Sequence, residues 1–598
     1  MDNELFEIKN KMLNSNLSFA EIVKEMKKYS KEEHSFDNNI KIAVIGSTSI
    51  QYFTSILKYN LNIRGLGVEV YESQYDGINS ALLNFDEKLI SFSPKFVVVL
   101  PYYTDIKSYP SLFANEEEYE RIISAEIERQ RVIWNNLERI KGVQVLQCNY
   151  VIPFINSLGS FEANTINSRN NYIRDINKRL LTNKPSFVTI VDLDAFASQV
   201  GKNDWFDFSG YFTTKSGFNL KYILPVTNQV CRLMISFLGK PKKCLVMDLD
   251  NTLWGDVVGD VGYNGIILDP NDPEGEAFRF FQSYIKQLKE RGVILAVCSK
   301  NDEKNAKEPF IKNPNMILSL DDISCFVANW ENKASNIEMI AKTLNIGIDS
   351  LVFVDDNKAE REIVRQTYPD VLVVDLPDDP DNYASALFNS GAFDWAEITK
   401  EDVLRSNTYI ENAKREELLK SNVDYDSYLD SLQMEAQISK VDNDSKERFI
   451  QLINKSNQFN LTTKRTNESI VQEMLSNPAI DLLTVTLKDR FSYYGIIACL
   501  IIKQENKRMI IDTFVMSCRV LKRGLEDLIF NYVAELADKN GCDEIIGEYI
   551  KTDRNSMVEE LYDKYGFTVI SMQENNKLYS LKADEYKKNQ KIFIQIKQ

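Results

Sequence analysis

The sequence contains a single histidine, His34, among 598 residues. This histidine lies in a charged segment that precedes the first apolar run typical of a strand. Ser-His-Asp catalysis, Cys-His dyads and histidine-ligated metal sites each require an imidazole inside a folded domain. We therefore expect any acid–base chemistry in this protein to depend on carboxylates or lysines.

Closely spaced cysteines and long apolar runs are also missing. The eight cysteines are scattered and none forms a Cys-x-x-Cys pair, which argues against a zinc site or a disulfide framework and favours reduced thiols. No apolar run reaches the roughly 20 residues needed to span a bilayer, and the acidic amino-terminal segment lacks a basic region. These absences predict a cytoplasmic protein with no membrane partner.

An excess of positive charge is lacking too, since the formal net charge is -16. Broad nucleic-acid binding needs a basic face, so no nucleic-acid partner is expected. With 44% hydrophobic residues, the chain has the composition of a globular protein, and its length is too great for one core. The predicted segments are lead helices at 1–37, an α/β domain at 38–240, a second α/β domain at 241–378, a helical connector at 379–434 and a last domain at 435–598.

The most informative stretch is an apolar run at 244–247 that is followed by Asp248, Asp250 and Thr252. Such a run is typical of a buried parallel strand, and open α/β sheets bind ligands at the carboxyl ends of these strands. Two carboxylates there can take different roles in phosphoryl transfer, with Asp248 as the nucleophile that attacks phosphorus and Asp250 as the group that transfers the proton. Because two acids so close repel each other, Mg2+ between them is expected. An Asp-x-Asp alone is more often a solvated turn, so the interpretation depends on later segments.

Three later segments supply the other parts of such a site. A second apolar strand ends in Ser299, whose hydroxyl can bind a phosphoryl oxygen. Lys333 opens a helical run and offers a cation for the same phosphate. A third apolar strand ends in Asp355 and Asp356, which can complete a metal site.

In this order, the strands, helices and side chains resemble the haloacid dehalogenase (HAD) phosphatase superfamily. The resemblance implies a multidomain α/β protein with a central HAD-type Rossmannoid parallel sheet. It also implies that Asp250 coordinates Mg2+ through its main-chain carbonyl. The metal ligands implied in this way are Asp248, Asp250, Asp355 and Asp356, and the phosphate-binding residues are Thr252, Ser299 and Lys333.

The flanking sequences resemble one group within that superfamily, the FkbH-like proteins of HAD subclass IIIC. The stretches that carry this resemblance are residues 248–262, 278–282, 296–302, 457–463 and 511–524. Three positions depart from the expected pattern: Asp256, Val261 and Lys522 stand where Gly, Asp and Gly are expected.

The FkbH-like resemblance implies a defined reaction. Such an enzyme takes 1,3-bisphosphoglycerate, removes its phosphate groups and loads the glyceryl unit as a thioester onto an acyl carrier protein with a phosphopantetheine arm. A cysteine relays the acyl group, and Cys298 is the candidate because it precedes Ser299, where a nearby metal and Lys300 would favour its thiolate. The alternative is that Cys298 is a small buried hydrophobe, in which case the relay belongs to another cysteine, such as Cys244 or Cys518.

The segment 38–240 alternates apolar strands with helical runs, which predicts a parallel sheet wrapped by helices. The predicted strands are residues 41–45, 95–100, 143–146 and 186–191. The pattern resembles the SGNH-hydrolase fold, with Ser47 at the nucleophile position and Asn149 near an oxyanion position. Because no histidine can complete that triad, we interpret the domain as a degenerate relative that serves docking or substrate binding.

The last domain resembles the GNAT acyltransferases, an α+β fold. A helix is predicted at 523–540, a strand at 544–549 and a helix at 555–565, and residues 562–567 resemble the closing signature of that group. The turn at 519–524 occupies the place that cradles a pyrophosphate, where main-chain N–H groups at a helix start suit an anion. We expect Arg519, Arg523 and Gly524 to bind the phosphate of a phosphopantetheine arm rather than acetyl-CoA. The alternative is that this basic cluster is a solvated helix face.

Two rival functions share parts of these motifs. A plain Mg2+-dependent phosphatase acting on a sugar phosphate or a phosphoprotein would need neither Cys298 nor the last domain. A non-catalytic scaffold would recruit carrier proteins through its outer domains, but the intact motif acids argue against this function.

Overall fold

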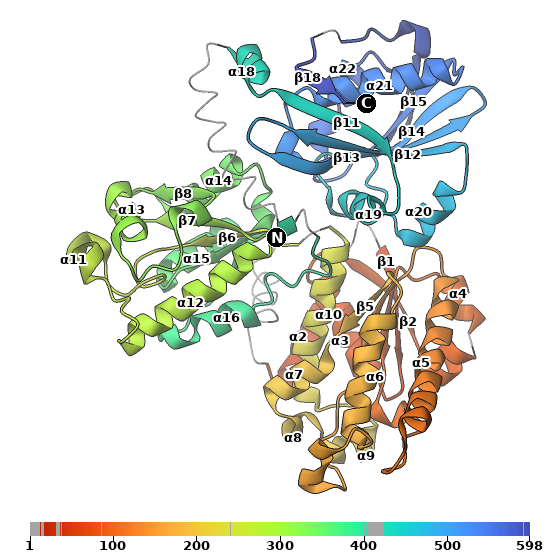
Figure 1. Ribbon diagram of the computed structural model, residues 1–598, viewed down its shortest axis with the longest axis vertical. Coiled ribbons are helices and arrows are strands. Elements are labelled where there is room, and N and C mark those ends of the chain that lie inside the picture. Colours follow the sequence, from red (N-terminus) through yellow and green to blue (C-terminus); the bar gives the residue numbers. More distant parts are fainter. Residues whose placement is uncertain are drawn as a thin grey trace. The chain divides into compact units, whose positions relative to one another are not determined.

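The computed structural model describes residues 12, 17–30, 36, 39–84, 86–239, 241–399, 402–403, 424–573, 575–589 and 591–597. The chain divides into two compact units, Met1–Met234 and Ile235–Gln598 (Figure 1). His34 and parts of the predicted lead helices and connector lie outside the described residues. Within those two segments the structure describes the helices α2 (Phe19–Tyr29), α16 (Tyr383–Asn389) and α18 (Tyr425–Ser431). Among the described helices, none combines the length and the apolar character needed to cross a membrane.

The first unit is built on a parallel sheet of order β2-β1-β3-β4-β5. Its strands are β1 (Asn39–Gly46), β2 (Gly67–Glu72), β3 (Phe96–Leu100), β4 (Gln144–Cys148) and β5 (Val188–Val191). Helices flank this sheet on both sides, among them α3 (Gln51–Asn62), α5 (Glu116–Glu138) and α6 (Arg169–Asn183) (Figure 1). The four strands predicted in this segment are confirmed. The edge strand β2 was not predicted, because charged residues interrupt its apolar positions.

The second unit begins with a five-stranded parallel sheet of order β10-β9-β6-β7-β8. Its strands are β6 (Cys244–Met247), β7 (Ile294–Ser299), β8 (Cys325–Ala328), β9 (Leu351–Val354) and β10 (Leu372–Val373). The central strand β6 pairs with β7 on one side and with β9 on the other. The predicted central parallel sheet is therefore confirmed, and the carboxyl ends of its three middle strands meet at one edge.

Helices cover both faces of this sheet, because successive strand residues point into two different cores. Met247 and Val297 pack in one core with α12 (Pro273–Glu290), α13 (Glu303–Lys312) and α16. Val246 and Cys298 pack in the other core with α14 (Lys333–Thr343) and α15 (Lys358–Thr367). The side chain of Cys298 therefore belongs to the core beneath α14.

The last domain is a mixed sheet of order β16-β17-β15-β14-β13-β12-β11-β18 (Figure 1). Its strands are β11 (Met434–Lys440), β12 (Ile480–Lys488), β13 (Tyr493–Glu505), β14 (Arg508–Met516), β15 (Glu544–Ile550), β16 (Thr568–Gln573), β17 (Asn576–Lys582) and β18 (Ile594–Ile596). The helix α21 (Leu525–Lys539) packs in the main core of this domain, and α19 (Lys446–Lys455) packs in a smaller second core. The predicted helix at 523–540 and strand at 544–549 are confirmed as α21 and β15.

The helix predicted at 555–565 is wrong. Ser556–Val558 form a 3-10 turn, and α22 (Leu561–Lys564) is a separate single turn. The side chain of Asn555 accepts from the Thr552 N–H at 2.8 Å and donates to the Asn460 carbonyl at 2.9 Å. These side-chain bonds to the main chain compete with helix formation at the expected start.

Candidate active site

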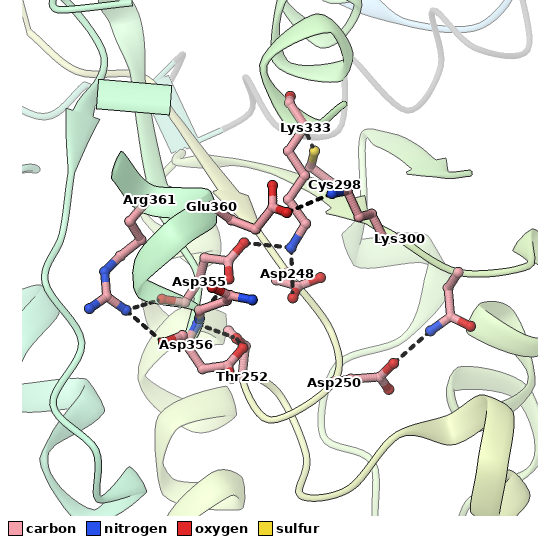
Figure 2. A network of polar contacts seen from close by, with 12 residues as sticks. Asp248, Asp250, Thr252, Cys298, Lys300, Lys333, Asp355, Asp356, Glu360 and Arg361 are labelled. Carbon is pink, nitrogen blue, oxygen red and sulfur yellow. Dashed lines mark hydrogen bonds and ion pairs between the residues drawn. The ribbon is translucent and has the colours of Figure 1, made fainter. Parts of the chain in front are cut away.

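Three acidic side chains meet at the carboxyl edge of the central sheet (Figure 2). Asp248 follows β6, and its main-chain N–H donates to the Val354 carbonyl of β9 at 3.0 Å. Asp355 and Asp356 follow β9 directly. Carboxylate oxygens of the three acids lie within 4.8 Å of one another. Such a cluster of hard oxygen ligands suits a divalent cation of the Mg2+ type.

Lys333, the first residue of α14, lies between two of these acids. Its Nζ is 2.8 Å from Asp248 Oδ2 and 2.5 Å from Asp355 Oδ2, and its side chain is 3% exposed. Asn332 caps the helix by accepting from the Ala334 N–H at 2.8 Å, which fixes the residue at which α14 begins. Burial opposes the charge of Lys333, but the two carboxylates outweigh burial and raise the pKa of its ammonium group. The lysine expected to meet a phosphate is therefore held in its charged form beside Asp248.

Burial and charge crowding change the titration of the acids that follow β9. Burial, followed by the charge of Asp248, raises the pKa of Asp355 to about 7. The same two causes raise the pKa of Asp356. Arg361 of α15 fixes this turn, because its Nη1 donates to the carbonyls of Asp355 at 2.6 Å and Asp356 at 2.9 Å. Arg361 was not predicted, since only the path of α15 brings its guanidinium back to the strand end.

One oxygen of Asp248 is available for chemistry. Oδ2 pairs with Lys333, whereas Oδ1 is buried and has no hydrogen-bond partner within the described part of the chain. A buried carboxylate oxygen without a partner is costly unless a ligand satisfies it. The donor set at this position therefore fits a bound cation or a phosphoryl group.

Asp250 lies apart from the three-acid cluster (Figure 2). Its Oδ1 accepts from Trp254 Nε1 and from the Val258 N–H, each at 2.9 Å, and its Oδ2 accepts from Asn301 Nδ2 at 2.7 Å. Burial raises the pKa of this carboxyl group. The crowded carboxylates are thus Asp248 and the pair after β9, whereas the Asp250 side chain is bound elsewhere, and the predicted coordination of Mg2+ by the Asp250 main-chain carbonyl stays a prediction. Asn301 and Trp254 were not predicted as contacts of Asp250.

The side chain of Thr252 contacts Asp356, one of the three clustered acids. It is fully buried, and its Oγ1 accepts from the Asp356 N–H at 3.1 Å and lies 3.4 Å from Asp356 Oδ1. This hydroxyl therefore positions Asp356, and the phosphate contact predicted for Thr252 stays a prediction. Ser299 ends β7 at the same edge of the sheet, two residues beyond the partner of Met247 in the strand register.

The environment expected for Cys298 is wrong. Its side chain is 0% exposed, and its Sγ lies 3.8 Å from the Lys333 carbonyl. Burial raises the pKa of this thiol, and the charge of Lys333, which favours the thiolate, does not offset burial. Among the cysteines whose side chains are described, Cys325 at the start of β8 is the one that is not buried. The side chain of Cys518, named as an alternative, lies outside the described part of the structure, and Cys244 is buried.

The first unit pairs its predicted nucleophile with an acid. Ser47 follows β1, and its hydroxyl donates to Asp105, which is 4% exposed and whose pKa is raised by burial. Asn149 is engaged elsewhere, because its Nδ2 donates to Asp192 Oδ1 at 2.7 Å and its Oδ1 accepts from the Asp194 N–H at 3.1 Å. The expected oxyanion role of Asn149 is therefore corrected, since these bonds connect its side chain to the segment at Asp192 and Asp194.

The arginine side chains of the predicted pantetheine site are engaged within the protein, and pantetheine binding there stays a prediction. Arg523 is 7% exposed, and its Nη1 lies 3.2 Å from Asp489 Oδ2 and 2.5 Å from the Tyr494 hydroxyl. Arg519 is 8% exposed, and its Nε donates to Ser517 Oγ at 3.2 Å. Gly524 precedes α21 with a left-handed φ of 80°. Two acids, Glu526 and Asp527, occupy the first turn of α21, so the charge at this helix start does not favour an anion.

Comparison with protein families bears on the first unit. A sequence profile described as FkbH, N-terminal domain, matches residues 41–234. No curated protein sequence matches the chain.

Comparison with solved structures bears on the rest. A GNAT-family acetyltransferase from Streptococcus pneumoniae matches at 17% identity, 25% of this chain, 99% of that chain and a TM-score of 0.21. The ribosomal-protein-S18-alanine N-acetyltransferase from Escherichia coli matches at 10% identity, 26% of this chain, 97% of that chain and a TM-score of 0.21. The N-terminal part of protein BF1531 from Bacteroides fragilis, which contains a phosphatase domain and was solved with Mg, is 34% identical over 64% of this chain and 100% of that chain, with a TM-score of 0.58. The chain therefore carries a HAD-like phosphatase domain and belongs to the FkbH-like family.

Proposed function

We propose that this protein is a Mg2+-dependent enzyme that removes phosphate from 1,3-bisphosphoglycerate and loads the glyceryl unit onto an acyl carrier protein. The observation that supports the phosphatase part is the cluster of Asp248, Asp355 and Asp356 with Lys333 held between two of the acids. The substrate and the carrier come from the FkbH-like resemblance.

The three clustered acids would hold the Mg2+. The carboxylate oxygens suit this ion, and the unpartnered Asp248 Oδ1 is an oxygen that a cation or phosphoryl group would satisfy. When bound, Mg2+ supplies positive charge that offsets the charge of the transferring phosphoryl group.

Asp248 is the nucleophile in this mechanism. Its Oδ1 forms a bond to phosphorus as the bond between phosphorus and the leaving oxygen breaks. Asp250 donates a proton to the leaving oxygen, and later takes a proton from the water that attacks the aspartyl phosphate. That attack releases phosphate and restores the Asp248 carboxylate. Lys333 keeps Asp248 in position, and the Ser299 hydroxyl donates to a phosphoryl oxygen.

The acyl step forms a thioester from the acyl phosphate. A thiolate sulfur bonds to the acyl carbon as the carbon–oxygen bond to phosphate breaks, and phosphate leaves with the electron pair. Cys298 is enclosed between β7 and α14, so a relay through its sulfur requires the start of α14 to move. Direct attack by the thiol of the carrier requires no such movement.

Intact-mass analysis tests the proposal. The full-length protein is incubated with Mg2+, 1,3-bisphosphoglycerate generated in place and a phosphopantetheinylated carrier protein, and both proteins are weighed. A glyceryl-sized gain on the carrier supports the proposal. Cys298→Ala separates the two routes, because a carrier gain that persists in this variant excludes a relay through Cys298.

A plain Mg2+-dependent phosphatase is the second candidate function. The burial of Cys298 favours it, since the central site then has phosphoryl-transfer groups but no exposed thiol among the described residues that face it. Phosphate release without a mass gain on either protein would support this function and contradict acyl transfer.

A further inference from the structure

Lys300 brings an exposed positive charge to the phosphoryl-transfer site. It follows Ser299 at the carboxyl end of β7, and its side chain is 40% exposed. Its Nζ lies 2.6 Å from Oε1 of Glu360, which belongs to the first turn of α15. Lys300 directly follows Ser299 and Glu360 lies four residues after Asp356, so the ion pair lies beside the site (Figure 2).

The two lysines of the site differ in how much of their charge is available. Lys333 contacts two carboxylates and is 3% exposed, so its charge is used inside the protein. Lys300 contacts one carboxylate, and an ammonium group has three N–H donors. Because the Lys300 side chain is 40% exposed, donors of its ammonium group remain available to a ligand from solvent.

Glu360 is suited to hold Lys300 in place. Its side chain is 13% exposed, and its Oε2 is buried without a hydrogen-bond partner within the described part of the chain. A carboxylate buried to this degree stays close to its lysine, because separation would leave a buried charge uncompensated. The ion pair with Glu360 of α15 thus holds Lys300 in place.

The charge balance of the site creates a need for this lysine. Without a bound cation, the acids Asp248, Asp250, Asp355, Asp356 and Glu360 outnumber the basic residues Lys300, Lys333 and Arg361. A substrate with a second anionic group meets repulsion from these acids unless that group finds a local cation.

We propose that Lys300, positioned by Glu360, is a specificity residue that binds the second anionic group of the substrate. The Ser299 hydroxyl then meets the phosphoryl group at Asp248, and Lys300 meets a carboxylate or second phosphate on the same small molecule. The site therefore prefers phosphorylated acids to phosphorylated alcohols. This inference rests on the proposed phosphatase function of the same site.

A matched pair of ligands tests the inference. 3-Phosphoglycerate and glycerol 3-phosphate share the phosphate ester and differ in a carboxylate against a hydroxymethyl group. Binding of each to the full-length protein is measured by calorimetry in the presence of Mg2+. We expect the wild-type protein to prefer the acid, and Lys300→Met to reduce that preference about tenfold, since a tenfold change corresponds to about 1.4 kcal/mol.

Two further variants separate charge from folding. Lys300→Arg keeps the positive charge and is expected to keep most of the preference, although its planar group differs in geometry. Lys307→Met is the control, because Lys307 also forms one ion pair, with Glu303, and its side chain is 35% exposed on α13. This control is expected to leave the ratio of the two affinities unchanged.

Each outcome has a defined meaning. If Lys300→Met weakens both ligands equally or neither, the inference is overturned and the proposed function stands. The proposed function fails as well under two conditions. The wild-type protein binds neither ligand in the presence of Mg2+, and it releases phosphate from 1,3-bisphosphoglycerate no faster than the Asp248→Asn variant does.

Discussion

Asp248 differs from the other acids of the cluster because one of its oxygens is buried and has no partner among the described residues. We predict that Asp248→Asn lowers the rate of phosphate release by at least about a thousandfold, because an amide cannot act as the nucleophile. Phosphate release with Mg2+ present measures the effect. Asp321→Asn, an exposed acid outside the site, is the control and is expected to behave as the wild type. Comparable release by the Asp248 variant would contradict the assigned role.

The elevated pKa of Asp355 predicts a pH dependence of metal binding. Burial raises this pKa from 3.8 to about 7, so Asp355 takes up a proton as the pH of the metal-free protein falls through 7. Since a protonated carboxyl group is a poor ligand, we expect the apparent Mg2+ affinity to fall by up to about tenfold per pH unit below that value and to level off above it. Calorimetric titrations from acidic to alkaline pH measure this dependence, and a pH-independent affinity would contradict it.

The same shift has a defined sign for stability. The folded protein binds this proton more tightly than the unfolded chain, whose aspartate has a pKa of 3.8. The contribution of Asp355 to the stability of the metal-free protein therefore decreases as the pH rises from about 4 to about 7. Bound Mg2+ is expected to remove this penalty, because it stabilises the ionised form.

The hydrogen bond from Asn301 to Asp250 allows a test of how the position of the Asp250 carboxyl group affects catalysis. Its Nδ2 donates to Asp250 Oδ2 at 2.7 Å, and its side chain is buried. We predict that Asn301→Ala lowers phosphate release from an alkyl phosphate more than from an aryl phosphate, by about tenfold, because an alkyl leaving group depends more on a well-placed acid. Burst-phase measurements with both substrate classes give this ratio. An equal loss with both classes would indicate a general structural defect instead.

At the scale of elements, the turn before α21 holds a lysine in a conformation that favours glycine. Lys522 has a φ of 63°, at a position where the FkbH-like pattern leads us to expect Gly. A left-handed residue with a Cβ costs roughly 1–2 kcal/mol, and part of this is recovered by Gly. We predict that Lys522→Gly raises the free energy of unfolding by up to about 1 kcal/mol, as measured by urea unfolding. Lys488→Gly in β12 is the control and is expected to lower it, so a loss of stability in both variants would contradict the prediction.

The departure at Asp256 has the same physical explanation. Its φ is 69°, and a left-handed conformation explains why Gly is expected there. Aspartate tolerates this conformation better than most side chains do. The main-chain N–H of Asp256 also donates to Asn251 Oδ1 at 3.0 Å, which stabilises the turn.

The elements themselves were largely predictable from the sequence. The apolar runs that became β6, β7 and β9 are short, continuous and bounded by polar residues, which is the pattern of buried parallel strands. The strand β2 and the broken helix at 555–565 were not predictable in the same way. In β2 the charged residues hide the strand, and at Asn555 the bonds that break the helix come partly from Asn460, which is distant in the sequence.

At the scale of the whole molecule, each of the three sheets has its own core. Within the second unit, Asn457 Nδ2 donates to the Gly239 carbonyl at 2.6 Å and Arg554 lies 2.6 Å from Asp349, but neither contact involves an acid of the cluster. We predict that a chain ending at residue 399 releases phosphate within about threefold of the full-length rate. The same truncated chain is expected to lose glyceryl transfer to the carrier. A larger loss of phosphate release would show that the last domain contributes to the phosphoryl-transfer site.

The sequence by itself determined which segments carry the chemistry. Apolar strands followed by Asp248, by Ser299 and by the acid pair Asp355 and Asp356 are local patterns, and a parallel sheet brings the ends of such strands together. The absence of histidine from the predicted domain cores likewise excludes a Ser-His-Asp triad on composition alone.

Only the tertiary structure decided which side chains touch. Cys298 lies in a core because α14 covers its face of the sheet, although the next residue ends the strand at the site. Asp250 bonds to Asn301, and Glu360 holds Lys300, through elements far apart in the chain. These contacts depend on which strand lies next to which and on the face that each helix covers. Such long-range packing follows from burying apolar surface across the whole domain, and no local pattern of residues specifies it.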